Sequence, residues 1–167
     1  MPIVAAVLLL AILFYSGGYV KQSIDTQNLD NINAADFGAW FPLMSDQLLS
    51  ALDEFFYEVE RVGGIAYVSP ASGSLGRYLG DDKHSQHNID FHGEIRAADI
   101  MIEGITLDDA YSIARQLRLF SGIGVYPQWT PAPGLHLDVR ETRSPESPAL
   151  WARIDGQYVS ISQAVIV

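Results

Sequence analysis

The 167-residue chain contains no cysteine. This absence excludes disulfide bonds, zinc sites built on thiolates and catalysis by a thiol nucleophile. It leaves the redox compartment open, because a chain without cysteine tolerates an oxidising or a reducing environment. Any metal ion that the protein binds must therefore be held by histidine, aspartate or glutamate side chains.

Basic residues are scarce as well. Ten Lys and Arg side chains stand against twenty Asp and Glu, which gives a formal net charge of -10. A protein that binds a phosphate backbone needs clustered Lys and Arg side chains, and the sequence has no such run. Nucleic acid is therefore not an expected partner, and the acidity is typical of a soluble surface.

Charge is absent altogether from Pro2 to Val20. A membrane-spanning helix needs about 17–25 mostly apolar residues, which this segment just provides. A secretory signal would have Lys or Arg before the apolar core and a clear cleavage pattern after it, and neither is present. We expect residues 1–21 to be a membrane anchor, with a cleaved signal segment as the second alternative and a buried core helix as the third.

The next segment, residues 22–43, is rich in Asn and Asp and shows no sustained period. This composition predicts a polar tether. The folded domain is then expected to occupy residues 44–167.

Two segments of that domain have the period of amphipathic helices. In the first, apolar residues recur at helical spacing between Leu48 and Val59, Ser45 can cap the start and Gly63 can end it. In the second, Thr106 can cap a helix whose first turn is acidic. The apolar side of the first helix is expected to pack on a core rather than to bind a partner.

Five further segments predict short strands. A long Gly-rich loop, residues 70–84, separates the first two, and such loops in compact domains are often functional. The order of helices and strands predicts an α+β domain with a small, mainly antiparallel sheet and flanking helices. The predicted strands are residues 65–69, 96–102, 122–127, 135–140 and 157–162.

Two histidines and an aspartate, His87, Asp99 and His136, form a candidate metal site. Two imidazoles and one carboxylate are a frequent ligand set of catalytic zinc, which keeps a fourth position for water. Asp99 stands in an apolar run, where an unpaired buried carboxylate would be costly. His136 and Asp138 alternate with apolar neighbours, so on a strand they share one polar face. Zn²⁺ is the expected cofactor, and ligands of this type also accept other divalent ions.

Three pieces of the chain follow a known motif order: SQH at 85–87, RAADI at 96–100 and GIGVYPQWTPAPGLHLDVR at 122–140. In this order the sequence resembles the zinc-dependent D-Ala-D-Ala peptidases, a family with a hedgehog-like fold that includes bacterial carboxypeptidases and phage endolysins. The third piece, with the closing segment 149–161, is similar to the phage and prophage branch. The resemblance covers residues 65–161 and implies a zinc site acting on peptidoglycan peptides.

The chain departs from the commonest form of that motif at the first ligand. In that form the first His stands seven residues before the Asp, a position occupied here by His92. However, His92 lacks the Ser-x-His context, and Ile95 occupies the usual Gly position. His87 has that context and stands twelve residues before Asp99, as in a variant with an inserted turn. We therefore predict His87 as the ligand and keep His92 as the alternative.

The general base is the second departure. Many relatives carry an acid a few residues before the last His, but residues 132–135 are Ala-Pro-Gly-Leu. Asp138 is the nearest candidate base, or it orients the metal-bound imidazole instead. Glu94 is a weaker candidate. Relatives place an arginine where Arg77 stands, and a guanidinium there can bind substrate or stabilise an oxyanion.

Together these features predict a membrane-tethered zinc peptidase that hydrolyses stem or cross-link peptides of peptidoglycan, as a DD-carboxypeptidase or an endopeptidase of phage origin. Its expected partners are the wall peptide and, through the N-terminal helix, the membrane. The domain would face the cell wall, or be secreted or virion-associated. The alternative is a non-catalytic member of the fold that binds the wall or serves as a virion or membrane component, which the missing acid before His136 supports.

Overall fold

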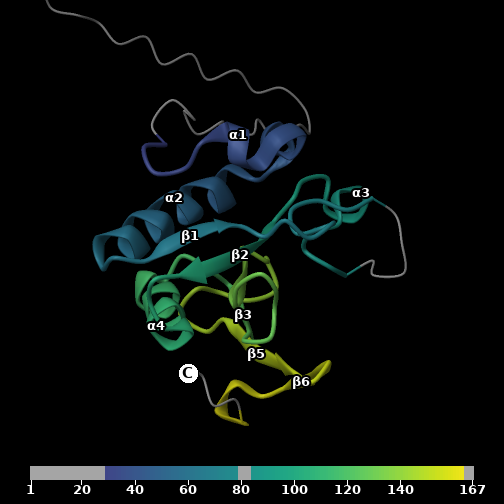
Figure 1. Ribbon diagram of the computed structural model, residues 1–167. Helices are drawn as coiled ribbons and strands as arrows, with labels where there is room; N and C mark the ends of the chain where they lie inside the picture. Colours follow the sequence, from purple (N-terminus) through teal and green to yellow (C-terminus); the bar gives the residue numbers. More distant parts are fainter. Residues whose placement is uncertain (1–28, 79–83, 164–167) are drawn as a thin grey trace, which may run out of the picture.

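The computed structural model describes residues 29–78 and 84–163 (Figure 1). The expected membrane anchor and the first part of the expected tether lie outside these residues. Within the described ranges, no helix is both long enough and apolar enough to cross a membrane.

A six-stranded mixed sheet forms the centre of the fold. Four of the five strand pairings are antiparallel, and β3 and β5 pair in parallel. The predicted α+β class is therefore confirmed. In spatial order the strands are β1 (Ile65–Val68), β2 (Ala97–Glu103), β4 (Gly134–Asp138), β3 (Gly122–Tyr126), β5 (Ala149–Ile154) and β6 (Gln157–Val159).

The parallel pair follows from the path of the chain after β4. Asp138, the last residue of β4, lies opposite Gly122, the first residue of β3. Residues 139–148 connect β4 to β5, and β5 starts beside Gly122, at the end of the sheet where β3 also starts. β5 has no counterpart among the strands predicted from the sequence. The last predicted strand, residues 157–162, ends earlier in the structure, because β6 ends at Val159 and the short 3-10 helix η3 (Ile161–Gln163) follows.

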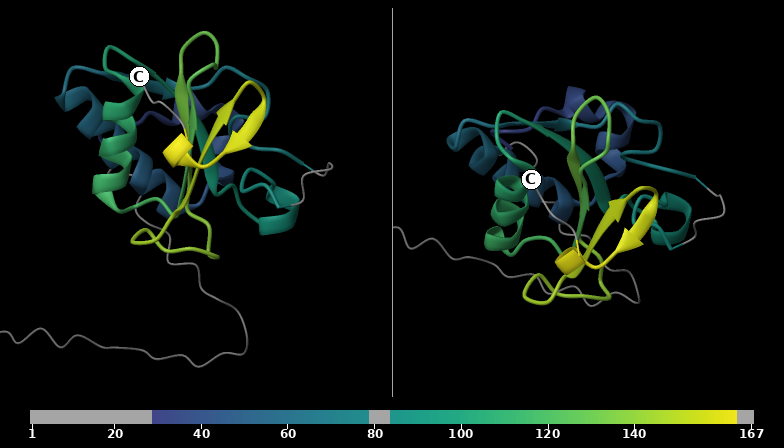
Figure 2. Two further views of the ribbon diagram at one scale, coloured as in Figure 1. Left: turned by 90° about the horizontal axis from the view of Figure 1, so that it is seen from below. Right: turned by 60° about the horizontal axis from the view of Figure 1, so that its bottom comes forward.

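The two predicted helices are present and have the predicted N-caps. Ser45 Oγ accepts a hydrogen bond from the backbone N of Leu48 at the start of α2 (Asp46–Arg61). Thr106 Oγ1 does the same for Asp109 at the start of α4 (Leu107–Leu117). Both helices lie against one face of the sheet, and the one-turn helix α3 (Ile89–His92) lies away from them (Figure 2).

Alternation along the strands divides the sheet into an apolar and a polar face. Ile100 on β2, Leu135 and Leu137 on β4 and Ile123 on β3 belong to the core under α2 and α4. The residues between them point to the opposite face. The polar face therefore carries Asp99, His136, Asp138, Tyr126, Trp151 and Arg153 on four adjacent strands.

Residues 29–43 belong to the folded domain rather than to a tether. They include helix α1 (Ala34–Phe37) and the 3-10 helix η2 (Gly38–Leu43), and the Phe37 side chain is buried in the core. The Asp53 carboxylate accepts hydrogen bonds from the backbone N atoms of Asn31 and Ile32. Ile32 and Phe37 are buried in the core by segments distant in the sequence, and their local spacing gives no periodic signal.

The central position of α2 gives a direct test of the core. Phe55 is fully buried and meets Phe120 edge to face at 6.0 Å between ring centroids. We expect Phe55→Ala to lower the free energy of unfolding by about 3–5 kcal/mol, because it leaves a cavity. Tyr57→Ala is the matched control on the same helix, since Tyr57 is 46% exposed, and should change stability by about 0.5 kcal/mol or less. Urea denaturation of both variants measures the difference. Equal losses of stability in the two variants would contradict the placement of Phe55 in the core.

Candidate metal centre

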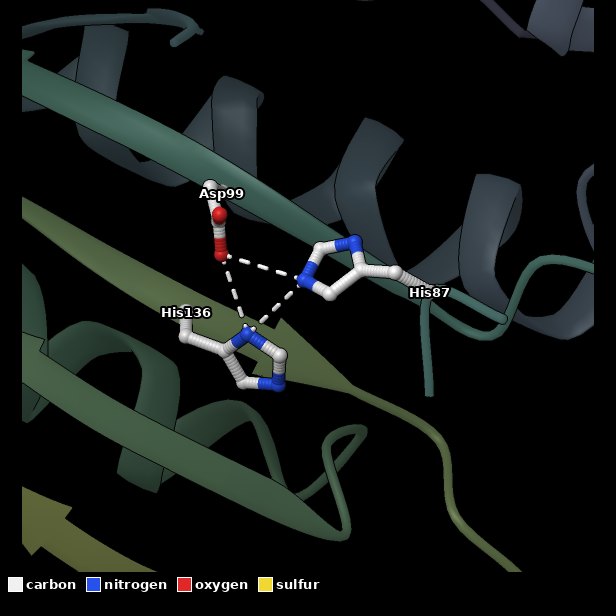
Figure 3. Close-up of side chains that lie close together, drawn as sticks. All are labelled: His87, Asp99 and His136. Atoms are coloured by element: carbon white, nitrogen blue, oxygen red, sulfur yellow. Dashed lines mark hydrogen bonds and ion pairs between the residues drawn. The ribbon is translucent and has the colours of Figure 1, made fainter. Parts of the chain in front are cut away.

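His87, Asp99 and His136 converge on one point of the polar face (Figure 3). The distances are 3.1 Å from His87 Nε2 to His136 Nδ1, 3.3 Å from His87 Nε2 to Asp99 Oδ1 and 3.0 Å from His136 Nδ1 to Asp99 Oδ1. Asp99 and His136 project from neighbouring strands, and His87 approaches from the side. The three residues predicted as metal ligands therefore lie together in the fold.

The spacing of these three atoms fits a tetrahedral zinc site. Ligand atoms at about 2.0–2.1 Å from zinc occupy tetrahedral corners that are roughly 3.3–3.4 Å apart. The observed separations of 3.0–3.3 Å are close to this edge length. Zinc therefore fits the three side chains and would use His87 Nε2, Asp99 Oδ1 and His136 Nδ1, with a fourth position left open.

Backbone pairing positions each of the three ligands. Asp99 on β2 and His136 on β4 are directly opposite each other in the antiparallel register. His87 lies in a segment held by hydrogen bonds from the backbone N of Arg77 to the carbonyl of His87, and from the N of Arg96 to the carbonyl of Gln86. The site thus rests on two strands and a braced loop rather than on a free loop.

The helix α3 accounts for the twelve-residue spacing between His87 and Asp99. Asn88 caps this single turn, and Gly93 ends it in the left-handed region with φ 74°. The turn includes His92, whose ring lies outside the group formed by the other three side chains. Burial and the nearby Arg96 lower the pKa of His92, which keeps it neutral. The geometry favours His87 over His92 as the ligand.

Hydrogen bonds at the far side of each imidazole select the tautomer that a metal needs. His87 Nδ1 lies 2.8 Å from the carbonyl oxygen of Leu75, which can only accept, so Nδ1 carries the proton and Nε2 is free. His136 Nε2 lies 3.0 Å from Asp138 Oδ2, so in the neutral ring this nitrogen is the donor. The remaining lone pairs of both rings then point at Asp99. Three acceptors facing one another require a cation between them.

In the metal-free protein a proton meets this requirement. Burial lowers the pKa of His136, but hydrogen bonds to Asp138 and Asp99 outweigh it and raise the pKa to about 9. Burial raises the pKa of Asp99, and its hydrogen bonds with His136 and His87 outweigh this and hold it below its usual range. A proton on His136 Nδ1 therefore occupies the place that a metal ion would take.

Asp138 and Arg140 hold the His136 ring in place through Nε2, the ring nitrogen that does not face Asp99. The Asp138 side chain has no solvent exposure, and Arg140 donates to both of its carboxylate oxygens, with Nε at 2.8 Å from Oδ1. Burial raises the pKa of Asp138, and the hydrogen bonds from Arg140 and His136 outweigh it and lower the pKa below the usual range. Of the two roles considered for Asp138, these contacts fit the orientation of His136.

Two glycines of β3 make room for this bracing. A Cβ atom on Gly122 would overlap the Asp138 carboxylate, and one on Gly124 would overlap the Trp151 indole. Trp151 in turn packs on His136 at 5.2 Å between ring centroids, and its Nε1 donates to Tyr126 Oη at 3.1 Å. The two glycines of the Gly-Ile-Gly segment in β3 therefore leave space on the polar face for Asp138 and Trp151, the side chains that hold His136 in place.

A cleft of ≈ 460 Å³ opens over the three ligands. Arg77 lines it, and its Nε donates to the carbonyl oxygen of Gly73 at 3.1 Å. Tyr126 and Trp129, stacked at 4.1 Å between ring centroids, form part of its wall. Among the described residues, Asp99 is the one acidic side chain in the lining. Neither candidate base lines the cleft, and Glu94 forms an ion pair with Arg96.

Several residues that shape the site were not identified from the sequence. Arg140 stands in the quoted LHLDVR segment without an assigned role, and the parts played by Trp151 and the Leu75 carbonyl depend on contacts between distant segments. The periodicity of β4 did predict that His136 and Asp138 share a face. Comparison of the chain with protein-family models, curated proteins and solved structures found no match.

Metal binding tests the ligand set directly. We expect the full chain to bind about one zinc ion and the variants His87→Ala and His136→Ala to lose it, because each removes one of three ligand atoms. The loss should exceed the ~10–100-fold that removal of an outer hydrogen-bond partner costs. His92→Ala is the matched control and should retain the metal. Plasma mass spectrometry after dialysis measures the content, and retention of zinc by His87→Ala would contradict the assignment.

Metal affinity should also depend on pH. Binding requires His136 Nδ1 to lose its proton, and the pKa of His136 is about 9 in the metal-free protein. The apparent affinity is therefore expected to rise about tenfold per pH unit up to pH 9 and to level off above it. Competition with a chelating dye across this range measures the slope. Asp138→Asn removes a charge that raises the pKa of His136, so its plateau should begin at lower pH, and a flat wild-type profile would contradict the proton competition.

Proposed function

We propose that this protein is a zinc-dependent peptidase that hydrolyses stem or cross-link peptides of peptidoglycan. One observation carries the proposal: three ligand atoms at near-tetrahedral spacing meet under an open cleft. Catalytic zinc sites combine three protein ligands with an open position in this way, whereas structural sites are closed by a fourth ligand. The resemblance of the SQH, RAADI and HLDVR segments to D-Ala-D-Ala peptidases supports the same reaction and substrate class.

Different side chains of the site would have different roles in amide hydrolysis. Zinc held by the three ligands would supply a Lewis acid that polarises the scissile carbonyl and activates water. Asp138 and Arg140 hold the His136 ring in its binding orientation. Arg77 lines the cleft and offers a guanidinium to the oxyanion that develops on the carbonyl oxygen. Tyr126 lines the cleft, and burial raises the pKa of its phenol.

One observation favours a second function, a non-catalytic wall-binding protein of the same fold. Amide hydrolysis uses a general base, and the described cleft has no carboxylate besides Asp99. Asp138 is enclosed and bound to Arg140, and Glu94 is paired with Arg96. A protein that only binds the peptide needs no such base. For either function, the uncharged segment Pro2 to Val20 would retain the domain at a membrane beside the wall, or export it.

Release of amino groups from purified peptidoglycan distinguishes the two functions. We expect the zinc-loaded full chain to release new amino groups, and a chelator or His136→Ala to abolish the release. Arg77→Gln should lower the rate by about 10²–10³-fold with zinc content unchanged, as loss of an oxyanion donor does.

The control for this experiment is His92→Ala, which should retain both zinc and activity. Co-sedimentation of the chain with peptidoglycan is measured in parallel. Sedimentation without amino-group release by the zinc-loaded protein would overturn the peptidase and leave the wall-binding function in its place.

A further inference from the structure

The charges that line the cleft differ from those of the rest of the chain. Acidic residues outnumber basic ones twenty to ten over the whole sequence. In the described lining of the cleft, two arginines, Arg77 and Arg153, stand against one acid, Asp99. Asp99 is already committed to His87 and His136. The cleft lining therefore carries a net positive charge, whereas the chain as a whole is acidic. A bound divalent metal would increase the positive charge of the cleft further.

The two arginines approach the ligands from opposite sides. Arg77 follows the segment Ser69–Ser74, which pairs with Asp99 of β2 on the β1 side. Arg153 is on β5, beyond β3 in the strand order β1-β2-β4-β3-β5-β6. The ligands Asp99 and His136 lie on β2 and β4, between them. A peptide with its scissile bond at the metal therefore meets an arginine on each side.

The strand that carries Arg153 is held in place. β5 and β6 are joined by Asp155 and Gly156, both at positive φ (48° and 77°), as in a tight two-residue hairpin turn. Gln128, in the loop after β3, clamps this turn: its Nε2 donates to Asp155 Oδ1 and its Oε1 accepts from the backbone N of Asp155, both at 2.7 Å. Asp155 is the acid nearest to Arg153 in the sequence, and its carboxylate is bound by Gln128.

The Arg153 side chain lies over an aromatic ring rather than against a carboxylate. Its guanidinium carbon lies 5.6 Å from the centroid of the Tyr158 ring, and its Nε donates to the carbonyl oxygen of Gly156 at 3.4 Å. By contrast, Arg61, Arg96 and Arg140 each form an ion pair within the described residues. A guanidinium that rests on a tyrosine face at a cleft edge keeps donors available for a planar anion.

We propose that Arg153 is the specificity-determining residue of the cleft and binds a carboxylate of the peptide on the β5 side of the scissile bond. The preferred substrates are then acidic peptides that carry a free carboxylate at that place. This inference rests on the proposed function for the reaction but not for the binding, because carboxylate recognition by Arg153 needs no hydrolysis.

The test compares two pairs of short labelled peptides. One pair differs by a C-terminal carboxylate or amide, and the other by an internal Glu or Gln. Binding to the full chain is measured by fluorescence anisotropy without metal, and kcat and KM are measured with zinc. A hydrogen bond to a charged group contributes about 1.5–3 kcal/mol, so wild type should prefer the acid of one pair by roughly 10–150-fold.

Three variants locate that preference. Arg153→Gln should abolish it, mainly through Kd and KM, and Arg153→Lys should restore part of it. Arg115→Gln is the matched control, because Arg115 is on α4, which covers the opposite face of the sheet, and it should leave the preference unchanged. Zinc content should be the same in all variants, since none of these residues contacts a ligand atom.

The outcomes separate the inference from the proposed function. An Arg153-dependent preference in binding, with no hydrolysis of any peptide, supports the inference and overturns the peptidase. Hydrolysis with equal treatment of acid and amide, or with a preference that survives Arg153→Gln, overturns the inference and leaves the peptidase standing. Absence of both hydrolysis and preference overturns both.

Discussion

The pairing of Asp99 with His136 across β2 and β4 is the interaction on which the rest of the site depends. It places a carboxylate and an imidazole 3.0 Å apart on a face of the sheet whose reverse side is the hydrophobic core. A partly buried carboxylate needs a positive partner, and the imidazole supplies one as long as it is protonated or shares a cation. His87 then completes a group of acceptors that is stable only with a proton or a metal ion at its centre.

Charge alternates outward from this centre through a continuous set of contacts. His136 connects Asp99 to Asp138, and Asp138 connects His136 to Arg140, whose guanidinium lies over the Trp151 ring at 5.2 Å. Each member satisfies its neighbour, so the whole set can be buried although no single member could be. The rigidity that results keeps the His136 ring in the orientation that metal binding requires.

The same arrangement explains why the cleft and the chain differ in charge. Asp99 lines the cleft but is paired with His87 and His136, and Asp138 is paired with Arg140 outside the cleft lining. The positive groups that the cleft presents are therefore Arg77, Arg153 and the metal position. Acidic residues elsewhere in the chain repel anions in general. An anionic peptide would therefore be attracted at the cleft and little elsewhere on the described surface.

Local patterns in the sequence determined much of this protein. Period-two alternation placed His136 and Asp138 on one face, helical spacing with Ser45 and Thr106 caps defined α2 and α4, and the lack of cysteine restricted metal ligands to His, Asp and Glu. Such features are local, because they depend on neighbours within one turn or one strand. The tertiary structure alone decided what depends on distant segments. It buried Ile32 and Phe37 in the core, placed β5 beside β3, and brought Trp151 to His136. Each of these depends on a contact between residues far apart in the chain, for which a single sequence carries no periodic signal.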